Sequence, residues 1–206
     1  MSSEIDEYNG GSVLAMLGKN CVAIASDKRF GMKLMTLGTE FPKIFQATDK
    51  IYIAMAGLAT DIQTLSELIR YKINMYKLRE EREIEPTTLA YMVASTLYER
   101  RFSPYYVSPL IAGLDKNNKP YICNMDLIGC VTTTNDFVVG GAADDCLLGT
   151  CEALYEPDLE PEDLFETISQ SLISAVDRNA ASGWGAVVHV LTPERVITRT
   201  LKTRQD

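Results

Sequence analysis

The sequence predicts an α+β protein, a four-layer αββα sandwich in which two antiparallel sheets are flanked by helices. The expected elements come in blocks, with strands first, then two helices, strands, two helices and strands again. Such blocks favour antiparallel sheets with helices layered outside them. The 206 residues also contain no linker, low-complexity tract or internal repeat, so they are most simply one globular domain.

Strand signals fill the first quarter of the chain. Alternating strand formers enclose a turn at residues 18–20, a pattern that predicts a β-hairpin. A continuous apolar run that ends at Gly57 is typical of a strand covered on both faces. The strands expected here cover residues 13–17, 21–25, 33–37, 43–46 and 51–56.

The hydrophobic period then changes to that of a helix, which predicts two helices. The first begins at Thr60 and Gln63, which fit a capping box, and runs to about Leu78. The second opens at Pro86, since proline suits the first position of a helix. The residues expected to be buried are Ile62, Leu65, Ile69 and Ile73 in the first helix and Leu89, Met92, Val93, Thr96 and Leu97 in the second.

The second half of the chain repeats this order. A third helix is expected over residues 143–154, and a fourth from Pro161, where an acidic first turn suits the positive end of the helix dipole. Strands are expected at residues 107–114, 119–124, 137–140, 186–191 and 195–201, the last two as a hairpin. The residues predicted to face inward are Leu147, Leu148, Cys151 and Leu154 in the third helix and Leu164, Ile168, Leu172, Ala175 and Val176 in the fourth.

The composition argues against several classes of protein. The chain has 28 acidic and 20 basic residues, a net charge of -8, which disfavours nucleic acid or an anionic membrane surface as a partner. No apolar run approaches the roughly 20 residues that a membrane span needs. Residues 1–7 are acidic and polar, unlike a signal peptide. We therefore expect a soluble, intracellular protein.

The cysteines do not have the spacing of a metal site or a disulfide framework. They are odd in number, include no CxxC pair and are accompanied by a single histidine. Because they lie in apolar stretches, we expect small buried side chains in a reducing compartment. The five are Cys21, Cys123, Cys130, Cys146 and Cys151.

Five short segments occur in a fixed order along the chain and are specific as a set. They are AGLATD at residues 56–61, LYERRF at 97–102, LYEP at 154–157, EPEDLFETISQ at 160–170 and SGWG at 182–185. On these segments the chain resembles the β-type subunits of the proteasome core particle, members of the N-terminal nucleophile hydrolases. The resemblance extends from about Asn9 to Asp206 and implies a threonine peptidase fold.

The resemblance implies that the attacking residue is missing. In active members the chain is cut after a glycine, and the new N-terminal threonine supplies a hydroxyl nucleophile and an amine that serves as its base, with a pKa of about 8. Aligning the family's Asp-x-Arg with residues 27–29 and its lysine with Lys43 places the threonine position at Gly11. Glycine has no hydroxyl, so residues 1–10 are expected to form an N-terminal extension of a single domain at 11–206.

The other polar positions of the family's site are partly retained. Asp27 and Lys43 are present, and we expect them to form a partly buried ion pair that holds the first hairpin against the sheet. The family's supporting serine falls at Ala142, and the aspartate of its Asp-x-x-Ser-Gly element falls at Asn179, whereas Ser182 is kept. Three of six polar positions are therefore lost, the nucleophile among them, so the resemblance implies a vestigial site without catalytic residues.

Other nucleophiles have weaker support. An independent N-terminal nucleophile hydrolase that uses Ser12 is the alternative, but a hydroxyl one residue along a strand points to the opposite face and would miss Lys43 and Asp27. His189 lacks a Gly-x-Ser-x-Gly partner motif and is expected to be a strand residue with one satisfied nitrogen. Residues 132–134, three threonines, are expected to be a β segment or turn.

As a whole, the resemblance implies a non-catalytic structural subunit of a β ring, in a four-ring particle of 28 α- and β-type subunits found in cytoplasm and nucleus. Such a subunit would wall the chamber that receives unfolded polypeptide in ubiquitin-dependent degradation, and would border the substrate pocket of a neighbouring active subunit. It would require no cofactor. In some relatives, carbonyls of the loop matching residues 176–182 bind structural magnesium, completed by a C-terminal carboxylate from another subunit, which Asp206 can supply.

Overall fold

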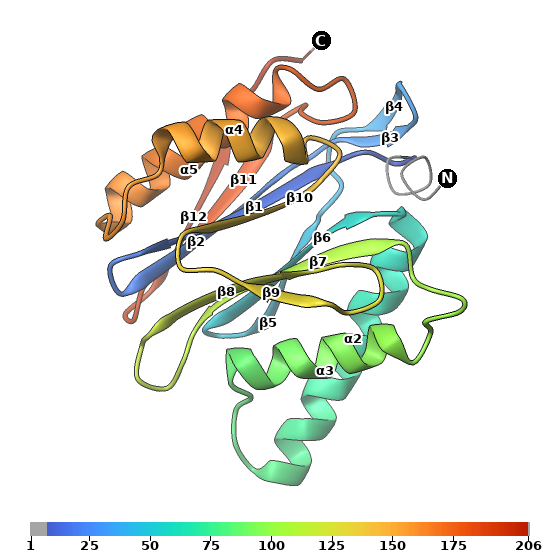
Figure 1. Cartoon of the computed structure of the whole chain (residues 1–206), viewed down its shortest axis with the longest axis vertical. Helices are drawn as coiled ribbons and strands as arrows, with labels where there is room; N and C mark the ends of the chain where they lie inside the picture. The colour runs from blue at the N-terminus through green and yellow to red at the C-terminus, as the bar shows by residue number, and fades with distance from the viewer. Residues whose placement is uncertain (1–7, 206) are drawn as a thin grey trace.

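The computed structural model describes residues 8–205 and confirms the predicted α+β sandwich. Two antiparallel sheets of five strands pack face to face, and pairs of helices cover the two outer faces (Figure 1). The helices are α2 (Ala59–Glu80), α3 (Pro86–Tyr98), α4 (Asp144–Leu154) and α5 (Pro161–Val176). No helix of the described chain is both long and apolar enough to cross a membrane.

The first sheet contains both ends of the described chain. Its strand order is β10-β1-β2-β11-β12, and each neighbouring pair is antiparallel. The predicted first and last hairpins are confirmed as its members. The strands are β1 (Ser12–Gly18), β2 (Cys21–Asp27), β10 (Phe137–Gly141), β11 (Ala186–Leu191) and β12 (Val196–Leu201).

The second sheet consists of the middle strands, in the order β5-β6-β7-β8-β9. The apolar run ending at Gly57 is a strand buried along its whole length, as its sequence predicted. The threonine-rich segment is a short edge strand. The strands are β5 (Ile44–Thr48), β6 (Ile51–Gly57), β7 (Val107–Leu114), β8 (Pro120–Met125) and β9 (Val131–Thr133).

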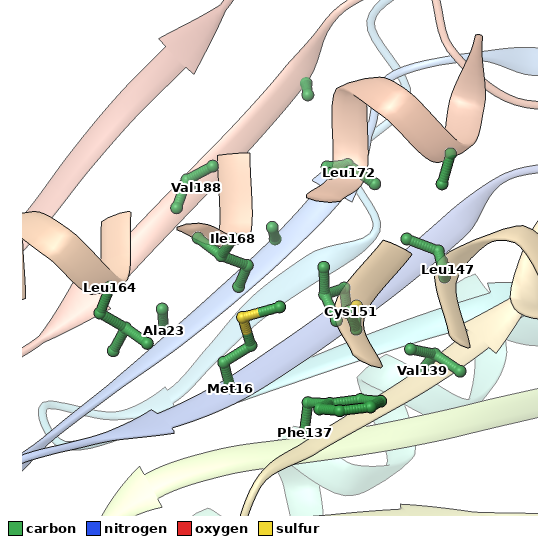
Figure 2. Close-up of a cluster of buried hydrophobic side chains, with 14 of the residues drawn as sticks. Met16, Ala23, Phe137, Val139, Leu147, Cys151, Leu164, Ile168, Leu172 and Val188 are labelled. Carbon is green, nitrogen blue, oxygen red and sulfur yellow. The ribbon is translucent and has the colours of Figure 1, made fainter. Parts of the chain in front are cut away.

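Alternation along β1 shows how the layers share the core. Val13 and Ala15 pack between the two sheets, whereas Leu14 and Met16 face the helical layer of α4 and α5. Figure 2 shows the cluster between this sheet and the helices α4 and α5, where Ile168 of α5 and Cys151 of α4 lie over Met16. A third cluster fills the space between the other sheet and the helices α2 and α3. Burial on both faces explains why the central strands read as continuous apolar runs.

Three local predictions were wrong. The strand expected over residues 33–37 is a separate hairpin of β3 (Phe30–Met32) and β4 (Met35–Gly38), because Lys33 takes a left-handed φ of 55° and turns the chain. The capping box at Thr60 is absent, because α2 begins one residue earlier and its N-cap is Leu58, which makes no side-chain cap. Leu148 and Leu154 of α4 are exposed, since the short helix buries only the face of Leu147 and Cys151.

The cysteines follow their prediction in part. All five are free thiols, of which Cys21, Cys123 and Cys151 are buried, Cys146 is half-buried and Cys130 is exposed. Burial raises the pKa of Cys21 and Cys123 to about 11 and that of Cys151 to about 12. These three thiols are therefore protonated packing groups at neutral pH.

Candidate functional site

Asp27 lies at the centre of a buried polar cluster at the end of β2. Its carboxylate is completely buried and accepts hydrogen bonds from the backbone N–H of Ser12, at 2.9 Å, and of Gly183, at 3.0 Å. The ammonium group of Lys43 lies 3.0 Å from the same carboxylate. Asp27 thus joins β1, the loop before β11 and the segment before β5, and a buried charge with this many partners is well satisfied.

Lys43 forms the predicted ion pair, but the pair is wholly rather than partly buried. Its side chain is 2% exposed, and its Nζ also donates to the carbonyl oxygens of Arg29, at 2.7 Å, and Asp27, at 3.3 Å. Burial lowers the pKa of Lys43, and the neighbouring Asp27 carboxylate opposes that shift. The lysine is held between β2 and β5 with no freedom to reorient.

Gly11 lies directly against this lysine. The residue has a left-handed φ of 97°, and a Cβ added to it would overlap Cε of Lys43. Its N–H donates to the carbonyl of Ala181 at 3.0 Å, and its own carbonyl accepts from Ala142 N at 2.9 Å. The Lys43 side chain therefore occupies the volume that any side chain at position 11 would need.

Ala142, whose N–H is bonded to Gly11, also accepts a hydrogen bond from the side chain of Asn179. The amide Nδ2 of Asn179 donates to the Ala142 carbonyl at 2.6 Å, and its Oδ1 accepts from Ala181 N at 2.8 Å. Both ends of the amide are used. A carboxylate at this position is able to form the second bond but not the first, because it has no proton to donate.

Ser182 lies with Ser12 on the other side of β1 from Lys43. The two hydroxyl oxygens are 2.7 Å apart, and Ser12 Oγ also accepts from Ala143 N at 3.1 Å. Within the described chain, neither hydroxyl contacts the side chain of Asp27 or Lys43. The Ser12 hydroxyl therefore contacts Ser182 and Ala143 and not the retained charged pair.

Arg29 is the main structural residue that sequence reasoning left without a role. It is completely buried, and its guanidinium donates to Thr36 Oγ1 at 3.0 Å and to the carbonyls of Ala181, at 3.1 Å, and Lys33, at 3.0 Å. Burial lowers its pKa. The Asp-x-Arg motif singled out Arg29 in the sequence. It could not indicate the three acceptors, because they lie outside the motif.

His189 is a strand residue, as expected. Its Nδ1 lies 2.8 Å from Thr198 Oγ1 on the paired strand, and its ring packs against Tyr52 with centroids 5.1 Å apart. Burial lowers the pKa of His189. Among the described residues its ring contacts the Thr198 hydroxyl and the Tyr52 ring, so the histidine is a packing residue of the inter-sheet region.

The loop at residues 176–182 lines a polar cavity of about 350 Å³, together with Thr203. The carbonyls of Val176 and Ala181 accept hydrogen bonds from Asn179 N and Gly11 N. Between residues 8 and 205 no cluster of three or more His, Cys, Asp or Glu side chains is placed to hold a metal. The oxygens that this loop offers are backbone carbonyls and the side chains of Asp177, Asn179 and Ser182, and oxygen ligands suit a hard cation such as magnesium. Asp206 lies outside the described residues.

The sequence was compared with known proteins. A family model described as "Proteasome subunit" matches residues 7–191. The chain is 57% identical to "Probable proteasome subunit beta type-3" of Schizosaccharomyces pombe over 202 residues, which covers 98% of this chain and 99% of the relative. It is 54% identical to the beta type-3 subunit of Saccharomyces cerevisiae, over 99% of this chain and 100% of the relative. The beta type-3 subunit of Picea mariana is 53% identical, with coverage of 98% and 99%.

Proposed function

Because the chain belongs to the proteasome subunit family, we propose that it is a non-catalytic β-type subunit of the proteasome core particle. Its role would be to fill one place in a β ring, to wall the proteolytic chamber and to border the substrate pocket of a neighbouring active subunit. The partners would be the α- and β-type subunits of the four-ring, 28-subunit particle, and unfolded polypeptide inside it.

The proposal that this subunit is not catalytic rests on the surroundings of position 11. At position 11 there is no hydroxyl, and the space for one is filled by Lys43, whose ammonium is fixed by Asp27. A peptide carbonyl brought to this point meets no group that can attack it. The nitrogen of Gly11 is an amide bonded to Ala181, so it is not a free amine base while residue 10 is attached.

Exposed apolar side chains support assembly. Leu34, Leu78, Tyr91 and Phe102 are 77%, 74%, 72% and 95% exposed, and they lie on the β3–β4 turn and the α2–α3 layer. In the proposed ring we expect neighbouring subunits to cover exposed side chains of this kind. Tyrosine is among the residues most enriched at interfaces.

A covalent probe for N-terminal threonines tests the proposal. The chain should copurify in a particle of several hundred kilodaltons by native mass spectrometry, and the probe should label other β-type subunits but not this one. Its mature N-terminus should lie before Gly11. Probe attached to this chain, a mature chain beginning at Ser12, or a chain found only as a free monomer would each overturn the proposal.

Two further points belong to the same proposal. The subunit would occupy cytoplasm and nucleus with its particle, which imaging of a tagged chain beside an α-type subunit tests by co-localisation. Magnesium would be held by oxygens of the loop at residues 176–182 and by a C-terminal carboxylate of a neighbouring subunit, and Asp206 would supply such a carboxylate to a neighbour's loop. Deleting Asp206 should then lower the yield of assembled particle without changing peptide hydrolysis; unchanged yield would contradict the metal site.

A further inference from the structure

The residues just before Gly11 are built into the fold rather than extended away from it. We call residues 8–10 the N-terminal arm. The carbonyl of Tyr8 accepts from Lys33 N at 2.7 Å, and that of Asn9 accepts from Gly31 N at 3.1 Å. Tyr8 thus pairs with Lys33 in the turn after β3, and Asn9 pairs with Gly31 within β3, so the arm runs antiparallel to this segment. Among the described strands, β3 otherwise pairs only with β4.

The side chain of Asn9 extends this connection to a third element. Its Nδ2 donates to Gly31 O at 2.9 Å, and its Oδ1 accepts from Ala59 N, also at 2.9 Å. Ala59 is the first residue of α2, whose own N-cap residue, Leu58, provides no side-chain acceptor. The first N–H groups of a helix have no partner within the helix and need one from elsewhere. Asn9 supplies one from 50 positions away in the sequence.

Gly10 completes the path of the arm. It has a left-handed φ of 66°, and a Cβ added to it would overlap the carbonyl oxygen of Ala181. The same oxygen accepts from Gly11 N and from Arg29 Nη1. The arm therefore passes in close contact with the loop that carries Asn179 and Ser182, and it covers the N-terminal side of position 11.

We propose that the N-terminal arm is a structural strap, in which Asn9 caps α2 and clamps β3 while covering the degenerate site. In the active members that the sequence resembles, the segment before the nucleophile is removed to release an amine. In this chain the corresponding residues carry hydrogen bonds of the fold. Cutting at the Gly10–Gly11 bond would release the cap of α2 and the two backbone bonds to β3 and to the turn after it. The inference concerns the chain itself and holds whether or not the proposed role in a ring is correct.

Hydrogen exchange of the full-length chain, in the assembly from which it is purified, tests the strap. Two variants separate its contacts: Asn9→Ala loses both side-chain bonds, whereas Asn9→Asp keeps an acceptor for Ala59 N but has no donor for Gly31 O. Asn135→Ala is the control, because Asn135 is exposed and its side chain makes no hydrogen bond to another described residue.

In Asn9→Ala, exchange at the start of α2 and at Gly31 and Lys33 should accelerate about fivefold, the effect expected from loss of one N-cap. In Asn9→Asp, the start of α2 should stay protected, since a carboxylate also suits a helix N-terminus, while Gly31 and Lys33 still accelerate. Asn135→Ala should leave all of these amides unchanged. Unchanged exchange in Asn9→Ala, or equal acceleration in both Asn9 variants at the start of α2, would overturn the strap. If Asn9→Ala yields no folded chain, the Asn9→Asp pattern alone decides.

Discussion

The side-chain amide of Asn179 donates a 2.6 Å hydrogen bond to the carbonyl oxygen of Ala142, at a position where active relatives are expected to carry an aspartate. An ionised aspartate could not make this contact, because it has no proton to donate. That contact connects the segment after β10 to the loop before β11, and the Ala142 N–H in turn donates to the carbonyl of Gly11. The altered positions touch one another, so they are expected to respond to mutation together.

Asn179→Asp should weaken the connection between the segment after β10 and the loop before β11. The new carboxylate would face the Ala142 carbonyl without a proton to donate, and we expect a loss of about 1 kcal/mol for this part-buried hydrogen bond. The measurement is the opening free energy of the Ala142 and Ala181 amides by hydrogen exchange in the assembled protein. Asn135→Asp makes the same chemical change at an exposed position and should leave these amides unaffected. Equal protection in Asn179→Asp and the unmodified chain would contradict the prediction.

Gly11→Ala should destabilise the chain even though it adds a single methyl group. The methyl group would overlap Cε of Lys43, and φ at this position is left-handed, so we expect a loss of about 1–3 kcal/mol from strain and overpacking. Thermal unfolding of the assembled protein is a direct measure.

The chain offers a matched control for that substitution. Gly149 lies within α4, and a Cβ added there meets nothing within 4 Å. Gly149→Ala should therefore be neutral or should stabilise by up to about 1 kcal/mol, because alanine is the better helix former. If both variants shift the unfolding temperature equally, the packing of Gly11 against Lys43 is not the cause.

Gly11→Thr should fail to restore peptide hydrolysis. The introduced threonine would need Lys43 to move from its contacts with Asp27 and Arg29, and positions 142 and 179 would still lack the serine and the aspartate that the resemblance leads us to expect in active members. The assay is hydrolysis of fluorogenic peptides in particles whose other β-type sites are blocked covalently. The mature N-terminus should remain before residue 11. Turnover above the blocked background, or a variant chain cut directly after Gly10, would show that the scaffold is closer to active than its contacts indicate.

Acidification should weaken the inter-sheet region through His189. Burial lowers the folded pKa of this histidine below its ordinary value of 6.5, so the unfolded chain binds the proton more readily. Stability from neutral His189 is thus complete above pH 6.5 and is lost as the pH falls from there towards the folded pKa. His189→Gln removes the titrating group, and the difference in unfolding temperature between variant and unmodified protein should change between about pH 7.5 and 5.5. A constant difference would contradict this assignment.

The sequence predicted those features that local patterns encode. The bounds of β7 and the buried stripe of α5 followed directly from hydrophobic period and from proline at the helix start. The strand at residues 33–37 failed because the alternation there continues through a turn, and only the left-handed φ of Lys33 reveals it. A propensity-based reading assigns such a residue to the strand, since non-glycine residues seldom adopt that conformation.

The sequence predicted the motif residues of the site but not their hydrogen-bond partners in distant segments. Asp27 and Lys43 were paired by resemblance, and the structure places them in contact. The bond between Ser12 and Ser182, which are 170 positions apart, and the cap that Asn9 provides for α2 depend on how distant segments meet. No local pattern specifies such partners, which is why the capping box at Thr60 was preferred to the true cap.

The position of Lys43 against Gly11 has a consequence for the history of such a chain. With Lys43 in this place, any substitution that adds a side chain at position 11 is expected to give a less stable protein. The intermediate forms would be selected against for their folding before any restored chemistry could favour them. The packing of Lys43 against Gly11 therefore opposes the gain of any side chain at position 11, a nucleophile included.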